Sequence, residues 1–297
     1  MYRNILILIW VLILCISCKR VPVKKQDTTD TPDIIPASGV TEVRPSSSLH
    51  LEMAVLWYQR SAEMRAISYQ TYNIARLLLD EKLKTIPDTV RPAVVVDVDE
   101  TVLNNSPFEA LLLKTGKKYN QEDWKLWIEK AEANPLPGSV EFLNYAISKE
   151  VEVFYISNRK DISLGQTLHN LKKFGFPNTE NKYLLFREND FSKEPRRKKV
   201  AEEYEILLFI GDNLADFTEL YENRGTDLGF DVVDKHSGDF GSRFLIMPNP
   251  IYGDWEKAIY NYRKDLSEEE RAKLRRSALE AFEPVADTME DESYHAD

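Results

Sequence analysis

The sequence has 297 residues, of which 43% are hydrophobic, and a chain of this size can bury a sizeable core in one domain with an elaborated edge. Its formal net charge is −10, so it lacks the basic surface on which non-specific nucleic-acid binding depends, and we expect no nucleic-acid partner. A small anionic substrate is not excluded, because a local cluster of cations or a bound metal ion can override the overall field.

The N-terminal segment predicts export. Arg3 precedes an almost wholly apolar run at 5–16, and residues 1–17 have the pattern of a signal peptide, short for a membrane span, which needs about 20 residues. The stretch CISC at 15–18 resembles a bacterial lipoprotein cleavage box, except that cysteine stands first where leucine is usual. Lipidation of Cys18 is therefore predicted, which places the protein at the bacterial cell envelope, on the outer membrane or facing the periplasm. An uncleaved anchor is the alternative.

The cysteines limit the chemistry of the exported body. The sequence holds two cysteines, and both lie in the N-terminal segment. Disulfides and cysteine-ligated metal sites are thereby excluded from the body. The histidines are scattered outside any motif, so a catalytic zinc site has no support. They are His50, His169, His236 and His295.

Two segments precede the central part of the chain. Residues 18–48 combine proline, threonine, serine and mixed charge, which is typical of a flexible linker. Residues 49–86 then place apolar side chains at helical spacing, without glycine or proline. This pattern predicts one long amphipathic helix or two abutting helices.

The stretch 93–107 is the centre of the predicted fold. Residues 93–96 form an unbroken apolar run rich in valine, typical of a strand buried on both faces in a parallel sheet. Asp97 and Asp99 follow directly, and ligands bind outside the carboxyl ends of such strands. Two carboxylates this close repel, so each must find a cation or a proton. A plain polar turn is the alternative, whereas an EF-hand calcium loop is excluded because Val102 stands where glycine is required.

The remainder of the chain alternates helices and strands. Such alternation predicts an α/β fold, a doubly wound parallel sheet with a long N-terminal helix. We expect one domain at 49–282, with a small helical cap at about 108–137 over the end of the first strand, and an acidic tail at 283–297. The other expected elements are helices at 138–149, 163–174 and 266–282 and strands at 151–156, 182–186, 206–210 and 244–247.

Polar residues follow two more of these strands. The strand at 151–156 ends in Ser-Asn-Arg at 157–159, and the strand at 206–210 ends in GDNLAD. Between them lies a basic stretch at 193–199, which is either functional or one solvated helix face. Because the carboxyl ends of parallel strands meet at one edge, we expect a carboxylate pair, a hydroxyl, a lysine and a second carboxylate pair to converge there.

This order of groups resembles the four-motif pattern of the haloacid dehalogenase-like phosphatases, with DVDET, YISNR, Lys193 and GDNLAD as the motifs. A closer resemblance, to the class C acid phosphatases or 5′-nucleotidase lipoprotein family, covers about residues 54–262. It rests on AVLWYQRSAEMRAISYQTYNIAR, DVDETVLNNSP, PLPGSVEFLNYA, YISNRKD, IGDNLADF and MPNPIYGDWEKAI in that order. Asn104 is a departure, because many relatives would carry an acidic residue there. This departure bears on the substrate preference or the detailed geometry of the metal site, and not on the reaction that the resemblance implies.

The resemblance implies hydrolysis of a phosphate monoester through an aspartyl-phosphate intermediate. Asp97 would be the nucleophile, and Asp99 would protonate the leaving alkoxide and later deprotonate the attacking water. Both carboxylates would be negative beside a dianionic substrate, so a divalent cation is needed, and oxygen ligands with open positions suit Mg²⁺. The family's ligands correspond to the Asp97 side chain, the Asp99 backbone carbonyl and Asp212. Asp216 would support them without touching the ion.

The resemblance also implies how the phosphate is held. Ser157 would donate a hydrogen bond to a phosphoryl oxygen, with Asn158 beside it, and Lys193 would neutralise developing charge on the same group. The basic stretch also offers Lys198 and Lys199. We prefer Lys193 because KEPR occupies the place of the family's lysine-x-x-arginine element.

We therefore predict a Mg²⁺-dependent acid phosphatase that acts on nucleoside 5′-monophosphates or similar small esters and is held to a membrane by its lipid. Aromatic residues that could stack on a base are Trp124, Trp127, Tyr252 and Trp255, with core packing as the alternative. A non-catalytic solute-binding lipoprotein is the rival from another class, but a binder would not need Asp99. A broad-specificity phosphatase or a phosphotransferase fits the sequence equally well, and a homodimer stays open.

Overall fold

The structure is a computed structural model that describes residues 49–282. The predicted signal peptide (1–17), the lipidation site Cys18, the linker (18–48) and the acidic tail (283–297) lie outside the described residues. Within the described part of the chain, no helix is both long enough and apolar enough to cross a membrane.

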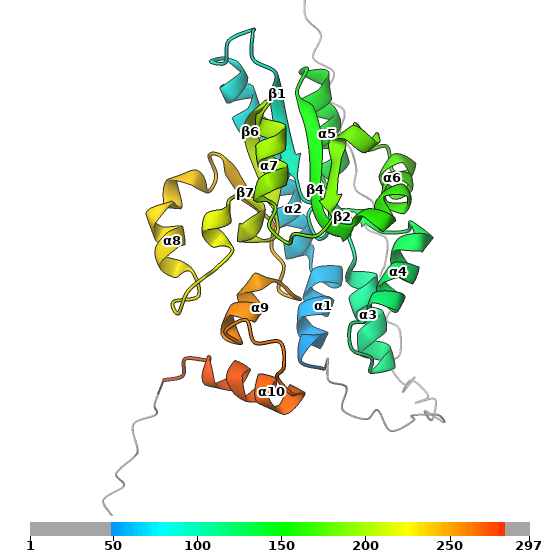
Figure 1. Ribbon diagram of the computed structural model, residues 1–297, viewed down its shortest axis with the longest axis vertical. Coiled ribbons are helices and arrows are strands. Elements are labelled where there is room, and N and C mark those ends of the chain that lie inside the picture. Colours follow the sequence, from blue (N-terminus) through cyan, green and yellow to red (C-terminus); the bar gives the residue numbers. More distant parts are fainter. Residues whose placement is uncertain (1–48, 283–297) are drawn as a thin grey trace, which may run out of the picture. The chain divides into compact units, whose positions relative to one another are not determined.

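A five-stranded parallel sheet forms the centre of the fold (Figure 1). Its strand order is β5-β4-β1-β6-β7, as expected for a doubly wound α/β fold. Val94, Val95 and Val96 of the central strand are buried, because this strand has a neighbour on each side and helices on both faces. The strands are β1 (Pro92–Val96), β4 (Glu152–Lys160), β5 (Leu184–Arg187), β6 (Glu205–Gly211) and β7 (Phe244–Ile246).

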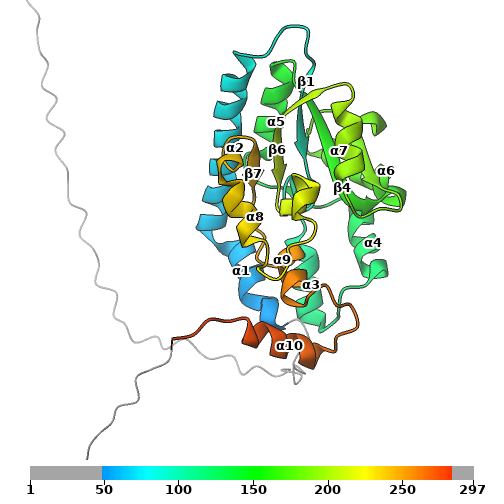
Figure 2. The same ribbon diagram turned by 60° about the vertical axis from the view of Figure 1, so that its left-hand side comes forward.

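Helices cover both faces of this sheet. α2 (Ala62–Leu83) and α5 (Ser139–Ser148) pack on one face, and α7 (Glu194–Ala201) packs on the other, as Figure 2 shows. The apolar side chains of these helices and of the strands between them form the core, which includes Leu79 and Leu143, both fully buried. The predicted α/β fold is confirmed.

The N-terminal helical segment is two abutting helices rather than one. α1 (Glu52–Arg60) ends at Ser61, whose backbone is extended. The Ser61 side chain accepts a hydrogen bond from the Met64 backbone N–H at 3.0 Å and so starts α2. α1 thereby lies beyond the carboxyl ends of the strands, whereas α2 runs along the sheet (Figure 1).

The predicted cap segment lies at the same end of the sheet as α1. It forms α3 (Ser106–Thr115) and α4 (Gln121–Lys130), and α3 packs against α1 (Figure 1). A short antiparallel pair, β2 (Leu103–Asn104) with β3 (Asn134–Pro135), joins the two ends of the segment. The helices are therefore an insertion held at its base.

β4 is longer than the sequence predicts. The strand continues through Lys160 instead of ending at Ile156, so Ser157, Asn158 and Arg159 belong to it. Ile156 pairs with Leu185 and Lys160 pairs with Arg187, so three residues of β4 face one residue of β5. An irregularity of this kind bends a strand and re-aims its side chains, which is common next to active sites.

Of the remaining helices, α6 agrees with the helix predicted at 163–174, whereas the others differ more from the predictions. α8 and α9 were not predicted, because a six-residue helix is too short for an apolar repeat to be recognised. α10 is shorter than the helix predicted at 266–282, since none of its residues is buried and no packing extends it. These helices are α6 (Leu164–Lys173), α8 (Phe230–Lys235), α9 (Asp254–Ile259) and α10 (Glu268–Ser277).

Candidate active site

The carboxyl ends of β1 and β6 bring three aspartates together. Asp97 follows β1, Asp212 follows β6 and Asp216 lies in the next turn, and their carboxylate oxygens lie within 4.8 Å of one another. Asp216 is turned back toward the strand end because its Oδ2 accepts a hydrogen bond from the Asn213 backbone N–H at 3.0 Å. Glycine is required at Gly211, since a Cβ there would lie 2.3 Å from Asp216 Oδ2. The GDNLAD motif therefore folds so that both of its carboxylates face Asp97.

Lys193 lies among these carboxylates. Its Nζ donates to Asp97 Oδ1 and to Asp216 Oδ1, the latter at 2.6 Å, and the residue is 6% exposed. Burial alone would lower the pKa of Lys193, but Asp216 and Asp97 outweigh it and raise that pKa above its usual value. Burial raises the pKa of Asp97, with the lysine opposing, and burial and Asp216 raise the pKa of Asp212. The cluster keeps an excess of negative charge, which a further cation would relieve.

The donor set fits a hard divalent cation. Asp97 and Asp216 are buried, Asp212 is half-buried, and carboxylate oxygens are the ligands such ions prefer. Asp212 is oriented by Asn249 Nδ2, which donates to its Oδ2 at 2.8 Å. Both oxygens of Asp216 already accept hydrogen bonds, from Lys193 and Asn213, which agrees with a supporting place for Asp216.

Asp99 faces a different neighbour, although it is two residues from Asp97. Arg159 donates to Asp99 Oδ1 through Nε at 2.9 Å and through Nη2 at 2.7 Å, and Asn105 Nδ2 donates to the same oxygen at 2.8 Å. The Asp99 side chain is 20% exposed, whereas that of Arg159 is 2% exposed. Arg159 belongs to the motif YISNR, but no role was predicted for it. Its place directly after two predicted site residues is the signal that was available.

The predicted phosphate-binding residues lie on the β4 side of the edge. Ser157 is fully buried, and its hydroxyl lies 3.3 Å from Asp99 Oδ2 and accepts from the Arg159 backbone N–H at 3.1 Å. Asn158 is exposed, and its Oδ1 accepts from Arg196 Nη2 at 2.7 Å. Arg196 Nη1 also donates to the Ser157 carbonyl at 2.6 Å. The second basic residue of KEPR thus supports the end of β4.

The basic stretch divides between the acidic cluster and the surface. Lys193 is buried in the acidic cluster, whereas Lys198 and Lys199 are exposed on α7. Lys198 pairs at the surface with Glu194 at 3.4 Å. Asn104, the departure from the family pattern, accepts hydrogen bonds from the backbone N–H and the hydroxyl of Ser106 at 2.9 and 2.6 Å, and so helps to start α3.

Glu100 is a buried carboxylate that the sequence analysis did not single out. Its φ of +55° is rare for a residue with a side chain, and it is fully buried. Asn105 N–H donates to Oε1 at 2.6 Å, and the Tyr252 hydroxyl donates to Oε2. Burial, and then the charge of Asp99, raise the pKa of Glu100 to about 8. The sequence signal that Glu100 is buried was its position between two apolar runs, in VVVDVDETVL.

The four predicted stacking residues all lie near this edge of the sheet. Each contacts a neighbour of one of the acidic groups, so each also has a structural role. The contacts are the Trp124 ring with the Arg159 guanidinium (5.6 Å), Trp127 Nε1 with Asn105 Oδ1 (2.8 Å), the Tyr252 hydroxyl with Glu100, and Trp255 Nε1 with the Asn249 carbonyl (3.1 Å).

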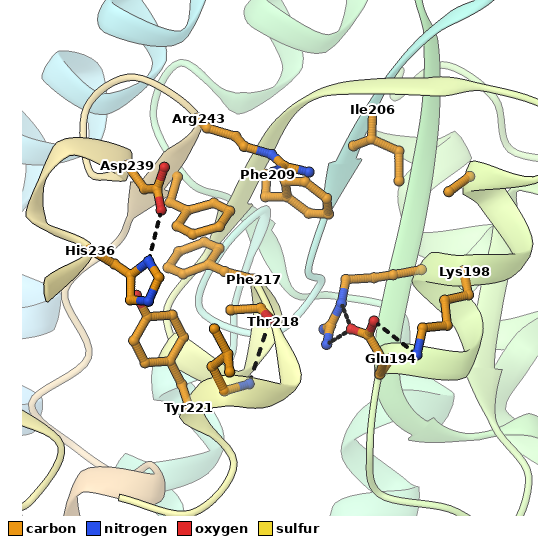
Figure 3. A pocket seen from close by; sticks show the side chains of 14 residues that line it. Glu194, Lys198, Ile206, Phe209, Phe217, Thr218, Tyr221, His236, Asp239 and Arg243 are labelled. Atoms are coloured by element: carbon orange, nitrogen blue, oxygen red, sulfur yellow. Dashed lines mark hydrogen bonds and ion pairs between the residues drawn. The ribbon is translucent and has the colours of Figure 1, made fainter. Parts of the chain in front are cut away.

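A cavity of about 320 Å³ lies behind the Asp216 turn and contains none of the predicted site residues (Figure 3). Phe217, Tyr221 and Arg243 are among the side chains that line it. Arg197 forms part of its wall and donates to the carbonyls of Ala215 and Asp216 at 2.9 and 3.1 Å. The candidate catalytic residues therefore lie outside this cavity, which is next to the turn that carries Asp216.

Comparisons with known proteins agree with this geometry. The chain matches the model of the acid phosphatase family, HAD superfamily subfamily IIIB, over residues 36–255. A solved structure of the class C acid phosphatase from Bacillus anthracis is 43% identical, covers 80% of this chain and 100% of its own, and has a TM-score of 0.77. A second structure of that enzyme, with tungstate bound, is 43% identical over 79% of this chain and 98% of its own, with a TM-score of 0.76.

A more distant relative is acid phosphatase 1 of Solanum lycopersicum, 24% identical over 173 residues, which are 56% of this chain and 60% of the relative. The family model covers well over half of the chain, and the first solved structure is matched along its whole length. The chain belongs to the acid phosphatases of HAD superfamily subfamily IIIB.

Proposed function

We propose that the protein is a Mg²⁺-dependent phosphomonoesterase that hydrolyses small phosphate esters, nucleoside 5′-monophosphates among them, through an aspartyl phosphate on Asp97. The observation that carries the proposal is the setting of Asp97. It is buried at the end of the central strand, bonded to Lys193 and within 4.8 Å of two further carboxylates. A carboxylate in that setting has both a reason to bind a cation and a fixed position from which to attack phosphorus.

The residues divide the reaction between them. The Asp97 carboxylate attacks the phosphorus atom, the ester P–O bond breaks, and Asp99 gives its proton to the leaving alkoxide. In the second half, Asp99 takes a proton from the water that attacks the aspartyl phosphate, inorganic phosphate leaves and Asp97 is restored. Arg159 orients Asp99 throughout through its two donors. Ser157, whose hydroxyl lies 3.3 Å from Asp99 Oδ2, would donate to a phosphoryl oxygen, and Asn158 follows it on β4.

Mg²⁺ would be held by the side chains of Asp97 and Asp212 and the backbone carbonyl of Asp99, with Asp216 supporting Lys193. When bound, the cation supplies the positive charge that lets these carboxylates and a phosphate dianion share one site. Lys193 stays protonated between Asp97 and Asp216 and keeps both carboxylates in place.

The N-terminal segment supports a place for this activity at the cell envelope. Residues 1–17 would act as a signal peptide and Cys18 would carry the lipid, which together tether the enzyme to a bacterial membrane. A lipidated cysteine with more than one acyl chain is enough for stable membrane association. Lipid labelling in a bacterial host should be lost in Cys18→Ser, and an unlabelled, soluble wild-type protein would contradict the anchor.

Release of inorganic phosphate from a small panel tests the function. The full-length protein is incubated with AMP, glycerol phosphate and a phosphodiester, with Mg²⁺ and with a chelator. We expect hydrolysis of both monoesters with Mg²⁺, little with the chelator, and none of the diester, because the diester lacks the dianionic phosphate. Absence of phosphate release from every monoester at saturating Mg²⁺ would overturn the proposal.

A further inference from the structure

Arg187 stands at the same edge of the sheet as the aspartates but outside their cluster. It is the last residue of β5 and pairs in register with Lys160 of β4. In the strand order β5-β4-β1, it lies two strands from Asp97. With neighbouring strands about 4.8 Å apart, the lateral separation is about 10 Å. This places the residue beyond the space for a phosphate at Asp97.

The guanidinium of Arg187 is stacked on an aromatic ring but has no acceptor for its N–H donors among the described residues. Among the described residues, none accepts a hydrogen bond from it or forms an ion pair with it, and its Nε is buried without a partner. The Phe191 ring, 67% exposed, lies 4.0 Å from the Arg187 Cζ atom. A ring stacked on the flat face of a guanidinium fixes its plane and leaves its edge donors free for an anion.

The other arginines of this edge differ from Arg187 in this respect. Arg159 binds Asp99, Arg196 binds the end of β4, and Arg197 binds Glu194 and the Asp216 turn. Each of these three has protein acceptors for its guanidinium, and Arg224, whose Nε is buried without a partner, still donates through Nη2 to Asn213 Oδ1 at 3.1 Å. Because an arginine carries five N–H donors and buried unpaired donors are unfavourable, an unpartnered guanidinium at such an edge indicates a missing acceptor.

Tyr119 links Arg187 to the neighbourhood of the candidate site. Burial and then the Asp99 charge raise the pKa of the Tyr119 hydroxyl, while the charge of Arg187 lowers it, so that hydroxyl lies within the influence of both. The ring of Tyr119 packs in turn against Trp124, which lies over Arg159. Arg187, at the end of β5, and Tyr119, between α3 and α4, therefore lie near each other at the side of the candidate site.

We propose that Arg187 binds a second anionic group, a phosphate or a carboxylate, on the same ester whose phosphate is hydrolysed at Asp97. This inference rests on the proposed function and narrows its substrate class. The favoured substrates are small phosphomonoesters with another negative charge beyond the scissile group, such as a nucleoside 3′,5′-bisphosphate or a phosphorylated hydroxy acid. The guanidinium donates two parallel hydrogen bonds to that group, and Phe191 keeps its plane fixed.

Matched substrate pairs test the assignment in the full-length protein. kcat/KM is measured for adenosine 3′,5′-bisphosphate against AMP, following loss of the 5′-phosphate by chromatography, and for 3-phosphoglycerate against glycerol phosphate. Arg187→Met keeps the stem and removes the charge. It should lower the ratio of kcat/KM within each pair by about 10- to 100-fold, the scale of losing a hydrogen bond to a charged group. Arg187→Lys should restore part of the ratio, because the charge returns without the fork.

The matched control is Arg91→Met. Arg91 also stacks on an aromatic ring, Tyr204 at 4.2 Å, but it precedes β1 at the opposite end of the sheet. It should leave both ratios unchanged. Equal ratios in wild type and Arg187→Met would overturn the proposal, as would equal losses in the two arginine variants.

A second measurement keeps the proposal testable if Arg187→Met does not fold. In the wild type, raising ionic strength should lower the bisphosphate-to-AMP ratio, because a partly exposed cation is screened. A ratio that does not change with salt would count against an exposed cation at the rim. Failure of the proposed function would look different, since neither AMP nor glycerol phosphate would then release phosphate.

Discussion

The two halves of the carboxyl edge of the sheet carry opposite charge. On the β1–β6 half, Asp97, Asp212 and Asp216 crowd around Lys193. On the β4–β5 half, Arg159 and Arg187 lie near the carboxyl ends of the strands, and Arg159 reaches Asp99. The division shows how one edge can keep a cluster of carboxylates and a group of arginines next to each other, with the Arg159–Asp99 ion pair between them.

Asp97 and Asp99 lie on opposite sides of this division, although one residue separates them. Asp97 is 6% exposed and bonded to a lysine that it shares with Asp216. Asp99 is 20% exposed on its side chain and bonded to Arg159. A buried carboxylate with fixed partners suits a nucleophile, and a more exposed carboxylate suits proton exchange with water. The following predictions test whether the two halves do separate work.

The proposed nucleophile on the acidic half, Asp97, has the largest expected effect. Asp97→Asn is isosteric, so it should fold normally and lose turnover by about 10⁴- to 10⁶-fold, as loss of a covalent nucleophile does elsewhere. Phosphate release from AMP measures it. Asp88→Asn, exposed in the loop before β1, is the control and should keep full activity. A variant at Asp97 with a tenth of the wild-type rate would show that another group attacks phosphorus.

The proposed metal ligand on the acidic half, Asp212, comes next. Asp212→Asn should lower activity by about 100-fold at low Mg²⁺, because one charged ligand is lost and affinity for the ion falls. Part of the activity should return as Mg²⁺ is raised. A titration of activity against Mg²⁺ measures the shift in midpoint. An unchanged midpoint would place the ion away from Asp212.

The basic half is tested through Arg159. Arg159→Met should leave Asp99 without its orienting donors and lower kcat by about 10- to 100-fold, part of what general acid–base catalysis contributes. KM for AMP should change less, since Arg159 is placed to act through Asp99. A kcat unaffected in a folded variant would mean that Asp99 needs no partner on this side.

A variant of Tyr252, one of the predicted stacking residues, tests whether this ring recognises a base or only supports Glu100. Tyr252→Ala should lower kcat/KM for AMP by about 5- to 150-fold, because base stacking is worth roughly 1–3 kcal/mol. Glycerol phosphate, which has no base, should lose much less. Tyr252→Phe keeps the ring and removes the hydrogen bond to Glu100. Equal loss on both substrates in both variants would leave Tyr252 with a structural role alone.

Glu109 is an acidic residue without a cation, and its effect should appear in stability rather than activity. Burial, and then Glu256 on α9, raise the pKa of Glu109 from 4.5 to about 7, and it has no ion-pair partner among the described residues. The folded state therefore holds a proton that the unfolded chain has lost, so stability falls as pH rises from about 4.5 to about 7.

In Glu109→Gln this loss should be absent. Between pH 5 and pH 8, its free energy of unfolding should fall by about 1–3 kcal/mol less than that of the wild type. Urea unfolding at both values measures the difference. Glu63→Gln, exposed on α2, is the control and should follow the wild type. Parallel pH profiles for Glu109→Gln and the wild type would show that Glu109 is ionised in the folded state.

The parts of the site that could be predicted depend on short stretches of sequence. An apolar run followed by Asp97, and another followed by GDNLAD, indicate strand ends, and parallel topology brings strand ends to one edge. Lys193 could be placed through KEPR. The extent of β4 could not, because its three extra residues before Lys160 are accommodated by pairing with β5 rather than by any local pattern.

Contacts between residues far apart in the chain could not be predicted from the sequence. Arg159 and Asp99 are 60 residues apart, and Tyr252 and Glu100 are 152 apart. Neither pair shares a local motif, so only the packing of β4 and of the segment after β7 against the β1 turn selects them. The lack of an acceptor for Arg187 Nε among the described residues likewise could not be predicted, because it depends on which side chains the fold places around that atom.

The sequence by itself determined the order of strands and helices, the position of Asp97 at a buried strand end and the family, because hydrophobic periodicity and motif spacing are properties of adjacent residues. Only the tertiary structure decided which cation faces which carboxylate. Lys193 binds Asp97 and Asp216, and Arg159 binds Asp99, because the strand order β4-β1-β6 sets each aspartate against a different neighbour. Electrostatic partners are chosen by distance in space, and that distance exists only once the sheet is assembled.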